Sequence, residues 1–390
     1  MSTTPQLLIH IADDKLGFLG YLAIDSFVHD TACGGIRVKI GENAPNGSYA
    51  QEAILLSREM TLKFGFHEIP LGGAKSVIIL PPDLPLEQRD RYFEVFGRHL
   101  KTLLNKNILQ VGQDMGMNGR DLYFVAKGSG RGGTDIPPVT QKSLSGQWTA
   151  LGMMETFKTV CQFDHSAPGA LTCGIEGFGA VGLHLAQLLD QDQFKIVAIS
   201  TVEGALYNPQ GLDVRQLVDL RGKYADKLVL HYPDAQKISK DELFTQEMDV
   251  LFPCAGLHSI NKENISHLQA KIVIAGSNCA ADDACAEFLH QRGIRYIPGF
   301  VANAASVLKS YITKQGGIKD LQGQERELKR LFAKRVDELL RKSTQSRVSE
   351  YQQAVQIAHE HINNFAQRKP SFMRRLKKKI ASIIRWSPIC

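Results

Sequence analysis

The chain has 390 residues, of which 43% are hydrophobic and 22% are charged, a balance typical of a soluble globular protein with room for two cores. No apolar run approaches the roughly 20 residues that a membrane-spanning helix needs, and the N-terminus lacks the pattern of a signal peptide. The net charge of +6 equals the six Lys and Arg of residues 371–390, which contain no acid. The rest is therefore near neutral, and we expect no nucleic-acid partner because such a partner needs a basic face.

Seven cysteines are present without a CxxC pair. An odd set without metal-ligand spacing predicts reduced thiols, a cytoplasmic location and no metal site.

The N-terminal part is predicted to alternate short strands with two longer helices. Apolar strands are expected at 7–12, 20–25, 76–80 and 108–112, and amphipathic helices at 50–64 and 88–104.

A glycine-rich stretch at 128–138 predicts a loop and hinge. Beyond it, strands and helices alternate: a helix at 148–161, a strand at 171–174, a helix at 180–189, strands at 195–200, 249–252, 272–275 and 295–297, and helices over 304–367. Such alternation is typical of a parallel sheet covered by helices, so we expect a two-domain α/β fold.

Two lysines flank an irregular segment in the first half of the chain. Lys75 follows the glycines Gly72 and Gly73, and Lys63 lies upstream. A lysine behind a flexible double glycine suits a site where backbone and ammonium both approach a small anion. Burial and mutual repulsion would lower the pKa of such lysines, so that one could act as a base. The alternative is two unrelated surface lysines.

These residues resemble the Glu/Leu/Phe/Val dehydrogenase family of amino-acid dehydrogenases, and most of all its leucine-dehydrogenase branch. Matching segments follow in the same order at 96–98, 113–116, 177–182, 207–213, 252–255, 275–278 and 303–304. The resemblance covers about three quarters of the chain. It implies a homo-oligomer in which a cleft separates an N-terminal α/β substrate domain from a Rossmann-type dinucleotide-binding domain.

The resemblance also implies the catalytic groups of an oxidative deamination. Lys63 would bind the substrate α-carboxylate, Lys75 would take a proton from the water that attacks the imine carbon, and Asp114 would carry protons to and from the amino nitrogen. Adjacent Lys75 and Asp114 would titrate as a coupled pair. For Asp114 the alternative is an Asx-turn before Gly116.

The side-chain pocket is also taken from the resemblance. Gly34 and Gly35 match a glycine pair whose backbone lies against the substrate, and relatives that use glutamate carry a lysine just before it. This chain has Cys33 there, which would leave a buried second carboxylate unpaired at high cost. The remaining pocket positions are Gly112, Val307 and Ser310. Gly112 resembles the branch that uses aromatic amino acids, and the Ser310 hydroxyl is of the kind seen in relatives that use glutamate. We expect a hydrophobic L-amino acid of the leucine, valine or phenylalanine type.

A dinucleotide-binding turn is predicted from Gly177-Phe178-Gly179-Ala180-Val181-Gly182, since these residues follow a predicted strand and open a helix. The acid expected to bind the adenosine ribose is replaced by Thr201, and Glu203 either takes that role or begins the next turn. No Lys or Arg lies between 196 and 206 to hold a 2′-phosphate, so NAD is favoured and NADP is not excluded. Further cofactor contacts implied by the resemblance are Cys254, Ala255, Ser277, Asn278 and Asn303.

Four parts of the chain are expected: a substrate-binding and oligomerisation domain at 1–145, a Rossmann domain at 146–305, helices returning to the first domain at 306–370, and a basic tail at 371–390. Ala305 and Ser306 stand where relatives usually have glycines, and Gly299 where an aspartate is common. These departures and the tail leave an alternative, a catalytically silent relative that binds nucleotide or amino acid as a regulatory or membrane-associated module.

The tail has the pattern of an amphipathic helix. Phe372, Leu376, Ile380 and Ile384 recur every four residues, and most basic residues lie opposite them. Such a helix could lie on the anionic inner face of the membrane, pack on a neighbouring subunit, or stay solvated. If the helix lies on the membrane, deleting residues 371–390 will abolish co-sedimentation with anionic liposomes, because each basic residue contributes about 1 kcal/mol at such a surface. Equal pelleting of the full and shortened chains would reject membrane contact.

Overall fold

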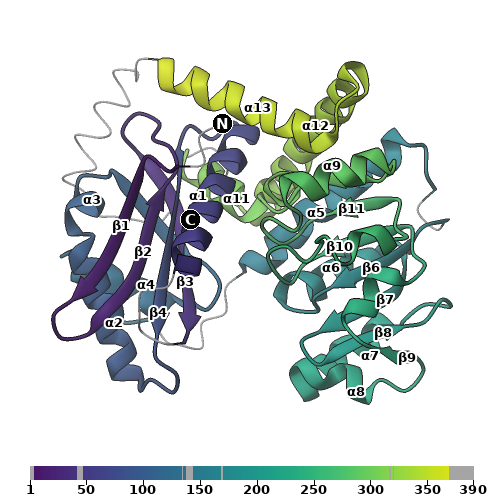
Figure 1. The fold of residues 1–390 in the computed structure, drawn as a ribbon, viewed down its shortest axis with the longest axis horizontal. Coiled ribbons are helices and arrows are strands. Elements are labelled where there is room, and N and C mark those ends of the chain that lie inside the picture. The colour runs from purple at the N-terminus through teal and green to yellow at the C-terminus, as the bar shows by residue number, and fades with distance from the viewer. Residues whose placement is uncertain are drawn as a thin grey trace. The chain divides into compact units, whose positions relative to one another are not determined.

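The computed structural model describes residues 4–41, 47–133, 135–137, 144–167, 170–315, 318 and 320–368. The chain divides into two compact units, Met1–Ser143 with Ile357–Cys390, and Leu144–Gln356 (Figure 1). The division falls two residues before the expected boundary at 145. The prediction that all of residues 306–370 return to the first domain is wrong for 306–356, which group with the second unit. The basic tail lies outside the described residues.

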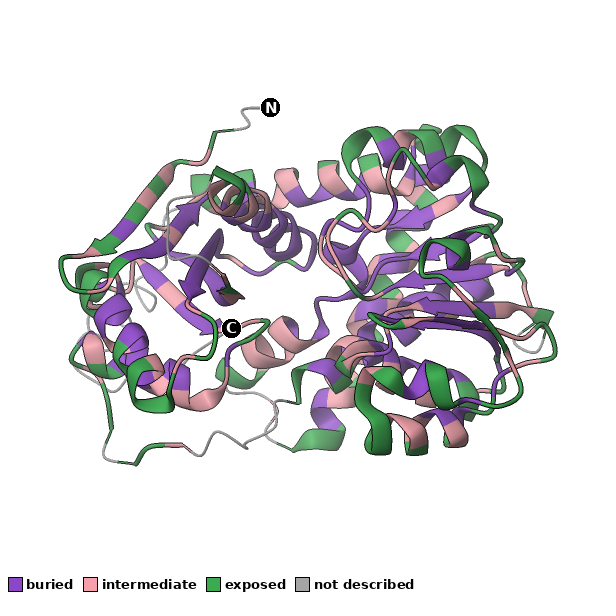
Figure 2. Ribbon diagram, turned by 60° about the horizontal axis from the view of Figure 1, so that its bottom comes forward, coloured by how far each residue is buried: buried purple, intermediate pink, exposed green. Residues whose placement is uncertain are grey.

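The first unit is built on a five-stranded sheet with the order β1-β2-β4-β3-β5. Its strands are β1 Leu7–Asp13, β2 Gly17–Ile24, β3 Ala32–Ile40, β4 Gly72–Leu80 and β5 Leu109–Gln113. Strand β3 runs parallel to β4 and β5, whereas β1, β2 and β4 pair antiparallel. The central strand β4 is buried along its whole length, and edge strand β1 alternates between exposed and covered residues (Figure 2).

Helices cover both faces of this sheet. Helix α1 (Gly47–Phe66) packs through Ala53 against Val77 and Ile79 of β4. Helices α2 (Leu86–His99), α3 (Lys101–Asn105) and α4 (Gly119–Gly128) pack on the opposite face, with Ala74, Ile78 and Leu80 in their core. Because side chains alternate along a strand, Lys75 lies on the α1 face, two residues before Val77.

The double glycine before Lys75 is part of strand β4, so the prediction of a flexible segment there is wrong. A Cβ at Gly73 would lie 2.2 Å from the Thr61 amide nitrogen and 2.3 Å from the Ser57 carbonyl oxygen. Glycine is thus needed because α1 approaches the strand closely. Strand β3 was not predicted, since its paired glycines weaken the strand pattern.

The second unit has a seven-stranded sheet with the order β12-β11-β10-β6-β7-β8-β9. The strands are β6 Thr172–Glu176, β7 Lys195–Thr201, β8 Gly204–Tyr207, β9 Gln236–Ile238, β10 Val250–Pro253, β11 Ile272–Ile274 and β12 Arg295–Ile297. The run from β12 to β7 is parallel, as expected for a Rossmann-type sheet. The short strands β8 and β9 add an antiparallel edge that was not predicted.

On one face of this sheet, Phe157 of α5 (Ser145–Phe163) packs edge-on against Phe252 of β10, with α6 (Ala180–Gln191) beside α5. On the other face, Leu243 and Leu289 join the core from η3 (Asp241–Thr245) and α9 (Asp283–Gln291). The remaining helices are α7 Val214–Tyr224, α8 Leu228–His231, α10 Gly299–Ala302, α11 Ala305–Lys314, α12 Leu321–Ser346 and α13 Glu350–Gln367.

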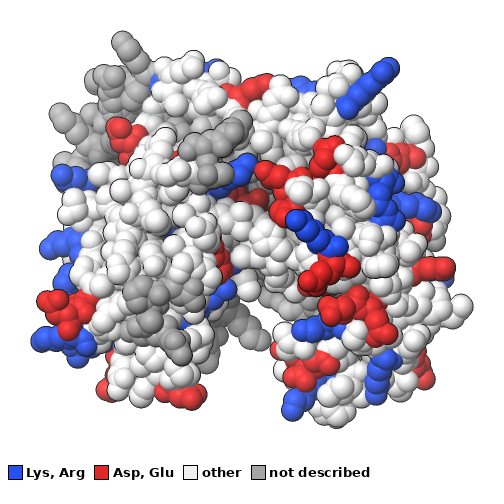
Figure 3. Space-filling view, viewed as in Figure 1, with Lys and Arg blue, Asp and Glu red and all other residues white. Residues whose placement is uncertain are grey.

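Within the described ranges, no helix is long and apolar enough to cross a membrane. On the face drawn in Figure 3, basic and acidic side chains are interspersed over the described surface and do not gather into one basic area.

Glycines allow α2 and α4 to cross closely. A Cβ at Gly97 would lie 2.0 Å from the Val125 carbonyl oxygen, whereas one at Gly222, in α7, would meet nothing within 4 Å. Gly97→Ala is therefore expected to lower the free energy of unfolding by about 1–3 kcal/mol through overpacking. Gly222→Ala, its matched control, should raise it by up to about 1 kcal/mol. Urea unfolding measures both; equal effects would contradict the close crossing.

Candidate active site

Strands β3, β4 and β5 present a set of residues to the α1 face of the first sheet. In the strand register, Cys33 pairs with Gly73, and Gly35 with Gly112. Since side chains alternate along a strand, the residues that share this face are Cys33, Gly35 and Arg37 of β3, Lys75 of β4, and Gly112 of β5 with Asp114 just beyond it. Neighbouring strands thus bring together residues far apart in sequence.

Asp114 is held between two buried cations. Its Oδ2 lies 2.7 Å from Lys75 Nζ and accepts a hydrogen bond of 2.8 Å from Arg37 Nε. Arg37 Nη1 also donates to Glu52 Oε1 of α1 at 3.0 Å. The side chains of Lys75, Arg37 and Asp114 are 3%, 6% and 18% exposed, so these charges attract one another with little screening by water.

The cluster sets the protonation of its members. Burial lowers the pKa of Lys75, and the Arg37 charge lowers it further, while Asp114 acts in the opposite direction. Burial alone would raise the pKa of Asp114, but Lys75 and Arg37 more than offset this and hold it well below the usual carboxyl range. The carboxylate is therefore ionised, and Lys75 gives up its proton more readily than an ordinary lysine.

Arg37 was not predicted from the sequence as a site residue. Alternate residues of a strand lie on the same face, so the spacing of Cys33, Gly35 and Arg37 could have placed Arg37 beside the predicted pocket. Without knowing that residues 32–40 form a strand, nothing in the sequence connects Arg37 with Asp114, 77 positions away.

The glycine pair of β3 makes room for the cluster. A Cβ at Gly35 would lie 2.8 Å from Asp114 Cβ, and one at Gly34 would lie 1.6 Å from the Ala74 carbonyl oxygen. Both positions thus have a packing role, which was not anticipated.

Lys63 lies in the last turn of α1, the helix that covers this face, and is 5% exposed. A cation there is favoured by the negative end of the helix dipole.

Cys33 is buried, as a pocket wall requires. Free cysteines in the described part of the chain include Cys161, Cys173, Cys254, Cys279 and Cys285. Val307 and Ser310 belong to α11 of the second unit, where Ser310 Oγ donates to the Ser306 carbonyl oxygen at 3.1 Å.

In the second unit, the three glycines after β6 have different roles. Gly177 adopts φ +93°, and a Cβ there would lie 2.7 Å from Ala255 Cβ. A Cβ at Gly182 would lie 2.1 Å from the Gly177 carbonyl oxygen, whereas one at Gly179 would meet nothing within 4 Å. Gly179 caps α6 without a side-chain hydrogen bond. The helix N-terminus is thus open to an anion such as a pyrophosphate.

Two hydrogen bonds tie the glycine turn to Ser200 of β7. Gly177 N donates to Ser200 Oγ at 3.0 Å, and Phe178 N donates to the Ser200 carbonyl oxygen at 2.7 Å. Ala180 and Val181 form the first turn of α6. The loop after β10 is fixed beside it, because Cys254 N donates to the Glu176 carbonyl oxygen at 2.7 Å and Ala255 N to Glu176 Oε2 at 3.1 Å.

Thr201 is buried at the end of β7, where its Oγ1 donates to the Asp226 carbonyl oxygen at 2.7 Å. Glu203 N donates to the same Oγ1 at 3.2 Å, and Glu203 itself is exposed. Residues 196–206 thus contain no basic side chain, and the nearby Arg221 is already paired with Asp226.

Asn303 and Ser277 carry polar atoms suited to a bound group. Asn303 Nδ2 donates to the Gly276 carbonyl oxygen and to Asn278 Oδ1, each at 3.1 Å. Asn303 Oδ1 and Ser277 Oγ are buried and have no hydrogen-bond partner within the described chain. Buried polar atoms normally have partners, so these two fit the carboxamide of a nicotinamide ring.

The departures from the family pattern fit this packing. Gly152 of α5 faces Ala305, and a Cβ at Gly152 would lie 2.9 Å from the Ala305 methyl carbon. A Cβ at Gly299 would lie 2.2 Å from the Ser277 carbonyl oxygen. Glycine at 152 therefore accommodates the added methyl, and glycine at 299 is needed here. Among the described residues, no group of three or more His, Cys, Asp or Glu could hold a metal ion.

The fold, the charged cluster around Asp114 and the glycine turn after β6 together define a two-domain α/β dehydrogenase. Residues 144–369 match the family model Glutamate/Leucine/Phenylalanine/Valine dehydrogenase, and residues 7–131 match Glu/Leu/Phe/Val dehydrogenase, dimerisation domain. The chain belongs to this family and is an NAD(P)-dependent amino-acid dehydrogenase acting on CH–NH2 donors.

Among curated relatives, NAD-specific glutamate dehydrogenase A of Halobacterium salinarum is 32% identical over 305 residues, covering 75% of this chain and 68% of that protein. NADP-specific glutamate dehydrogenase of Saccharolobus shibatae is 27% identical over 332 residues, covering 80% and 76%. Both of these relatives are glutamate dehydrogenases, so the likeness to the leucine branch stays a prediction.

Two solved structures show the same fold. Hetero-hexameric glutamate dehydrogenase from Thermus thermophilus (Leu bound form) has a TM-score of 0.77 at 19% identity, covering 93% of this chain and 89% of that one. L-tryptophan dehydrogenase from Nostoc punctiforme has a TM-score of 0.65 at 20% identity, covering 94% and 98%.

Asp114→Asn is expected to lower the free energy of unfolding at neutral pH by about 3 kcal/mol, because it removes the buried carboxylate that pairs with both Lys75 and Arg37. The folded-state pKa of Asp114 is lowered. Its contribution is therefore fully present above the unfolded pKa of about 3.9 and is lost as the pH falls through the folded value.

The difference in stability between the parent protein and Asp114→Asn should consequently narrow below about pH 4. Urea unfolding between pH 3 and pH 7 measures it. Asp213→Asn is the control, because asparagine can keep the cap of α7. A gap that stays constant or widens on acidification would contradict the ionised carboxylate.

Proposed function

We propose that this protein catalyses the reversible oxidative deamination of an L-amino acid with an uncharged side chain. In the forward direction, amino acid, NAD+ and water give the 2-oxo acid, ammonium, NADH and a proton. The observation that carries the proposal is the buried Lys75–Asp114 pair, in which Lys75 Nζ and Asp114 Oδ2 lie 2.7 Å apart.

In this mechanism the protein's side chains hold the substrate and move protons. Lys63 binds the α-carboxylate as a buried ammonium. Lys75, whose pKa is lowered by burial, takes a proton from the water that attacks the imine carbon. Asp114 passes protons to and from the amino nitrogen, and Arg37 keeps it ionised between transfers. A bound nicotinamide dinucleotide would supply the hydride acceptor.

The open N-terminus of α6 at Gly179 would bind the pyrophosphate, and Asn303 and Ser277 the nicotinamide carboxamide. We propose NAD as the cofactor, because Thr201 replaces the ribose-binding acid without adding a cation and Arg221 is already paired with Asp226. NADP is not excluded, since relatives specific for either cofactor match the chain. NAD+ is expected to give the higher kcat/KM; a preference for NADP+ would refute this assignment.

An uncharged substrate is supported by the residues on the α1 face. Cys33 is uncharged and buried. Gln110 pairs with Cys33 in the strand register, and its Oε1 is buried without a hydrogen-bond partner in the described part of the chain. Arg37 is committed to Asp114 and Glu52. A second substrate carboxylate would find no further cation among these residues.

Glutamate is the second candidate substrate, because the curated relatives reported above are glutamate dehydrogenases. Glutamine and glutamate make the sharpest comparison, since they share a shape and differ in charge.

A panel of leucine, valine, phenylalanine, tryptophan, glutamine and glutamate with NAD+, followed at 340 nm, decides between the candidates. We expect the best uncharged substrate to exceed glutamate by at least about a hundredfold in kcat/KM, because an unpaired buried carboxylate costs several kcal/mol. Glutamate as the best substrate would overturn the proposal. No turnover by folded protein that binds NAD+ would instead support a catalytically silent relative.

We also propose a cytoplasmic homo-oligomer. The match to a dimerisation domain over residues 7–131 and the hexameric assembly named for the Thermus thermophilus relative support association. Sedimentation of a single monomeric species at micromolar concentration would contradict it.

A further inference from the structure

The turn that carries Asp114 is tied to the sheet by the backbone. This turn, residues 114–118, joins β5 to α4. The Met117 amide donates to the Asp114 carbonyl oxygen at 3.0 Å, and the Val38 amide donates to the Met115 carbonyl oxygen at 2.9 Å. Gly116 adopts φ +77°, a conformation that suits glycine. Backbone bonds of this kind set where the Asp114 carboxylate points.

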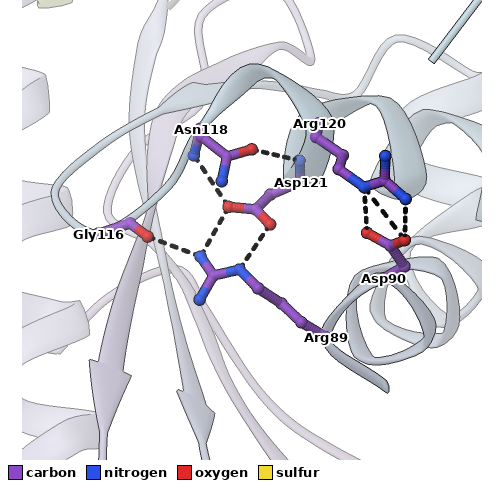
Figure 4. A network of polar contacts seen from close by, with 6 residues as sticks. All are labelled: Arg89, Asp90, Gly116, Asn118, Arg120 and Asp121. Atoms are coloured by element: carbon purple, nitrogen blue, oxygen red, sulfur yellow. Dashed lines mark hydrogen bonds and ion pairs between the residues drawn. The ribbon is translucent and has the colours of Figure 1, made fainter. Parts of the chain in front are cut away.

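One arginine holds the far side of the turn. Arg89 of α2 donates through Nη2 to the Gly116 carbonyl oxygen at 2.8 Å (Figure 4). The same guanidinium forms two bonds to Asp121 of α4, from Nε to Oδ1 at 2.8 Å and from Nη2 to Oδ2 at 2.7 Å.

Asp121 in turn binds Asn118, the last residue of the turn. Its side chain is fully buried, and its Oδ2 accepts from the Asn118 amide at 2.9 Å. The Asn118 side chain accepts from the Asp121 amide at 3.0 Å and so closes a capping box at the start of α4. Arg89 and Asp121 together therefore fix Gly116 and Asn118, which follow Asp114 in the chain.

The same two helices contain a nearly identical pair that does not touch the turn. Arg120 of α4 binds Asp90 of α2 through Nε at 2.8 Å and Nη2 at 2.5 Å. Both arginines are about equally exposed, 20% for Arg89 and 21% for Arg120. Each also lies over an aromatic ring four residues on, Phe93 and Phe124 respectively.

We propose that Arg89 is a positioning residue for the proton-carrying Asp114, because it binds the Gly116 carbonyl and Asp121 at once and so fixes the 114–118 turn. The inference rests on the proposed function for its effect on turnover, but its structural part is independent of it. Arg120 is not part of this arrangement: Figure 4 shows its guanidinium directed at Asp90 alone.

Arg89→Lys and Arg120→Lys are a matched pair of tests. Each keeps the positive charge and loses the planar fork of donors, so both should lower thermal stability by a similar amount. Only Arg89→Lys removes the donor that binds Gly116 and Asp121 together. Amide hydrogen exchange of a peptide covering 112–118 should therefore be faster in Arg89→Lys and unchanged in Arg120→Lys.

Turnover gives the second readout. Arg89→Lys is expected to lower kcat by roughly tenfold to a hundredfold, because small displacements of a reacting group are costly. KM for the amino acid should change little, since Lys63 lies on α1. Arg120→Lys should keep kcat within about twofold of the parent. This pattern with the exchange result supports the proposal.

Equal exchange over 112–118 in the two variants would overturn the proposal, and so would faster exchange in Arg89→Lys without a fall in kcat relative to Arg120→Lys. If the parent protein itself turned over no amino acid, the proposed function would fail. The exchange comparison alone would then decide whether Arg89 fixes the turn.

Discussion

The proposed chemistry depends on one buried ionic contact, the Asp114 carboxylate between Lys75 and Arg37. Burying any of these charges alone would be costly, and together they compensate one another. The sheet is organised to permit the contact. Gly35 leaves space for Asp114, Gly73 lets α1 close over Lys75, and the register of β3, β4 and β5 places all three charged groups on one face. Altering any one of these packing features would change the distance between Lys75 and Asp114.

The same contact bears on the proposed role of Lys75 as a base. Burial and Arg37 lower the pKa of Lys75, while Asp114 limits that effect. The net effect is a lowered pKa, so Lys75 releases its proton more readily than an ordinary lysine and can then accept one from water. Arg37, which is paired with both Asp114 and Glu52, holds a charge that does not titrate, and so keeps the carboxylate ionised whatever the state of Lys75.

Much of the fold and part of the site could be predicted from the sequence. The parallel strands of the second unit have long apolar runs, and the glycine turn before α6 has a distinctive spacing, so both were recognised. Strand β3 was missed because its glycines, which the site requires, weaken the local strand signal. Arg37 was missed with it, since its partner Asp114 is distant in sequence. The rigidity of Gly73 was also hidden, because a glycine in a crowded strand and one in a flexible loop look alike in sequence.

The most direct test of this account is the turnover of a Lys75→Ala variant with the best amino acid substrate and NAD+. The Asp114 carboxylate keeps its bond to Arg37 in this variant, so the fold should persist, as near-UV circular dichroism can verify. The account predicts a fall in kcat of roughly a hundredfold or more, the range expected for loss of a general base. A variant that turns over as fast as the parent protein would contradict it.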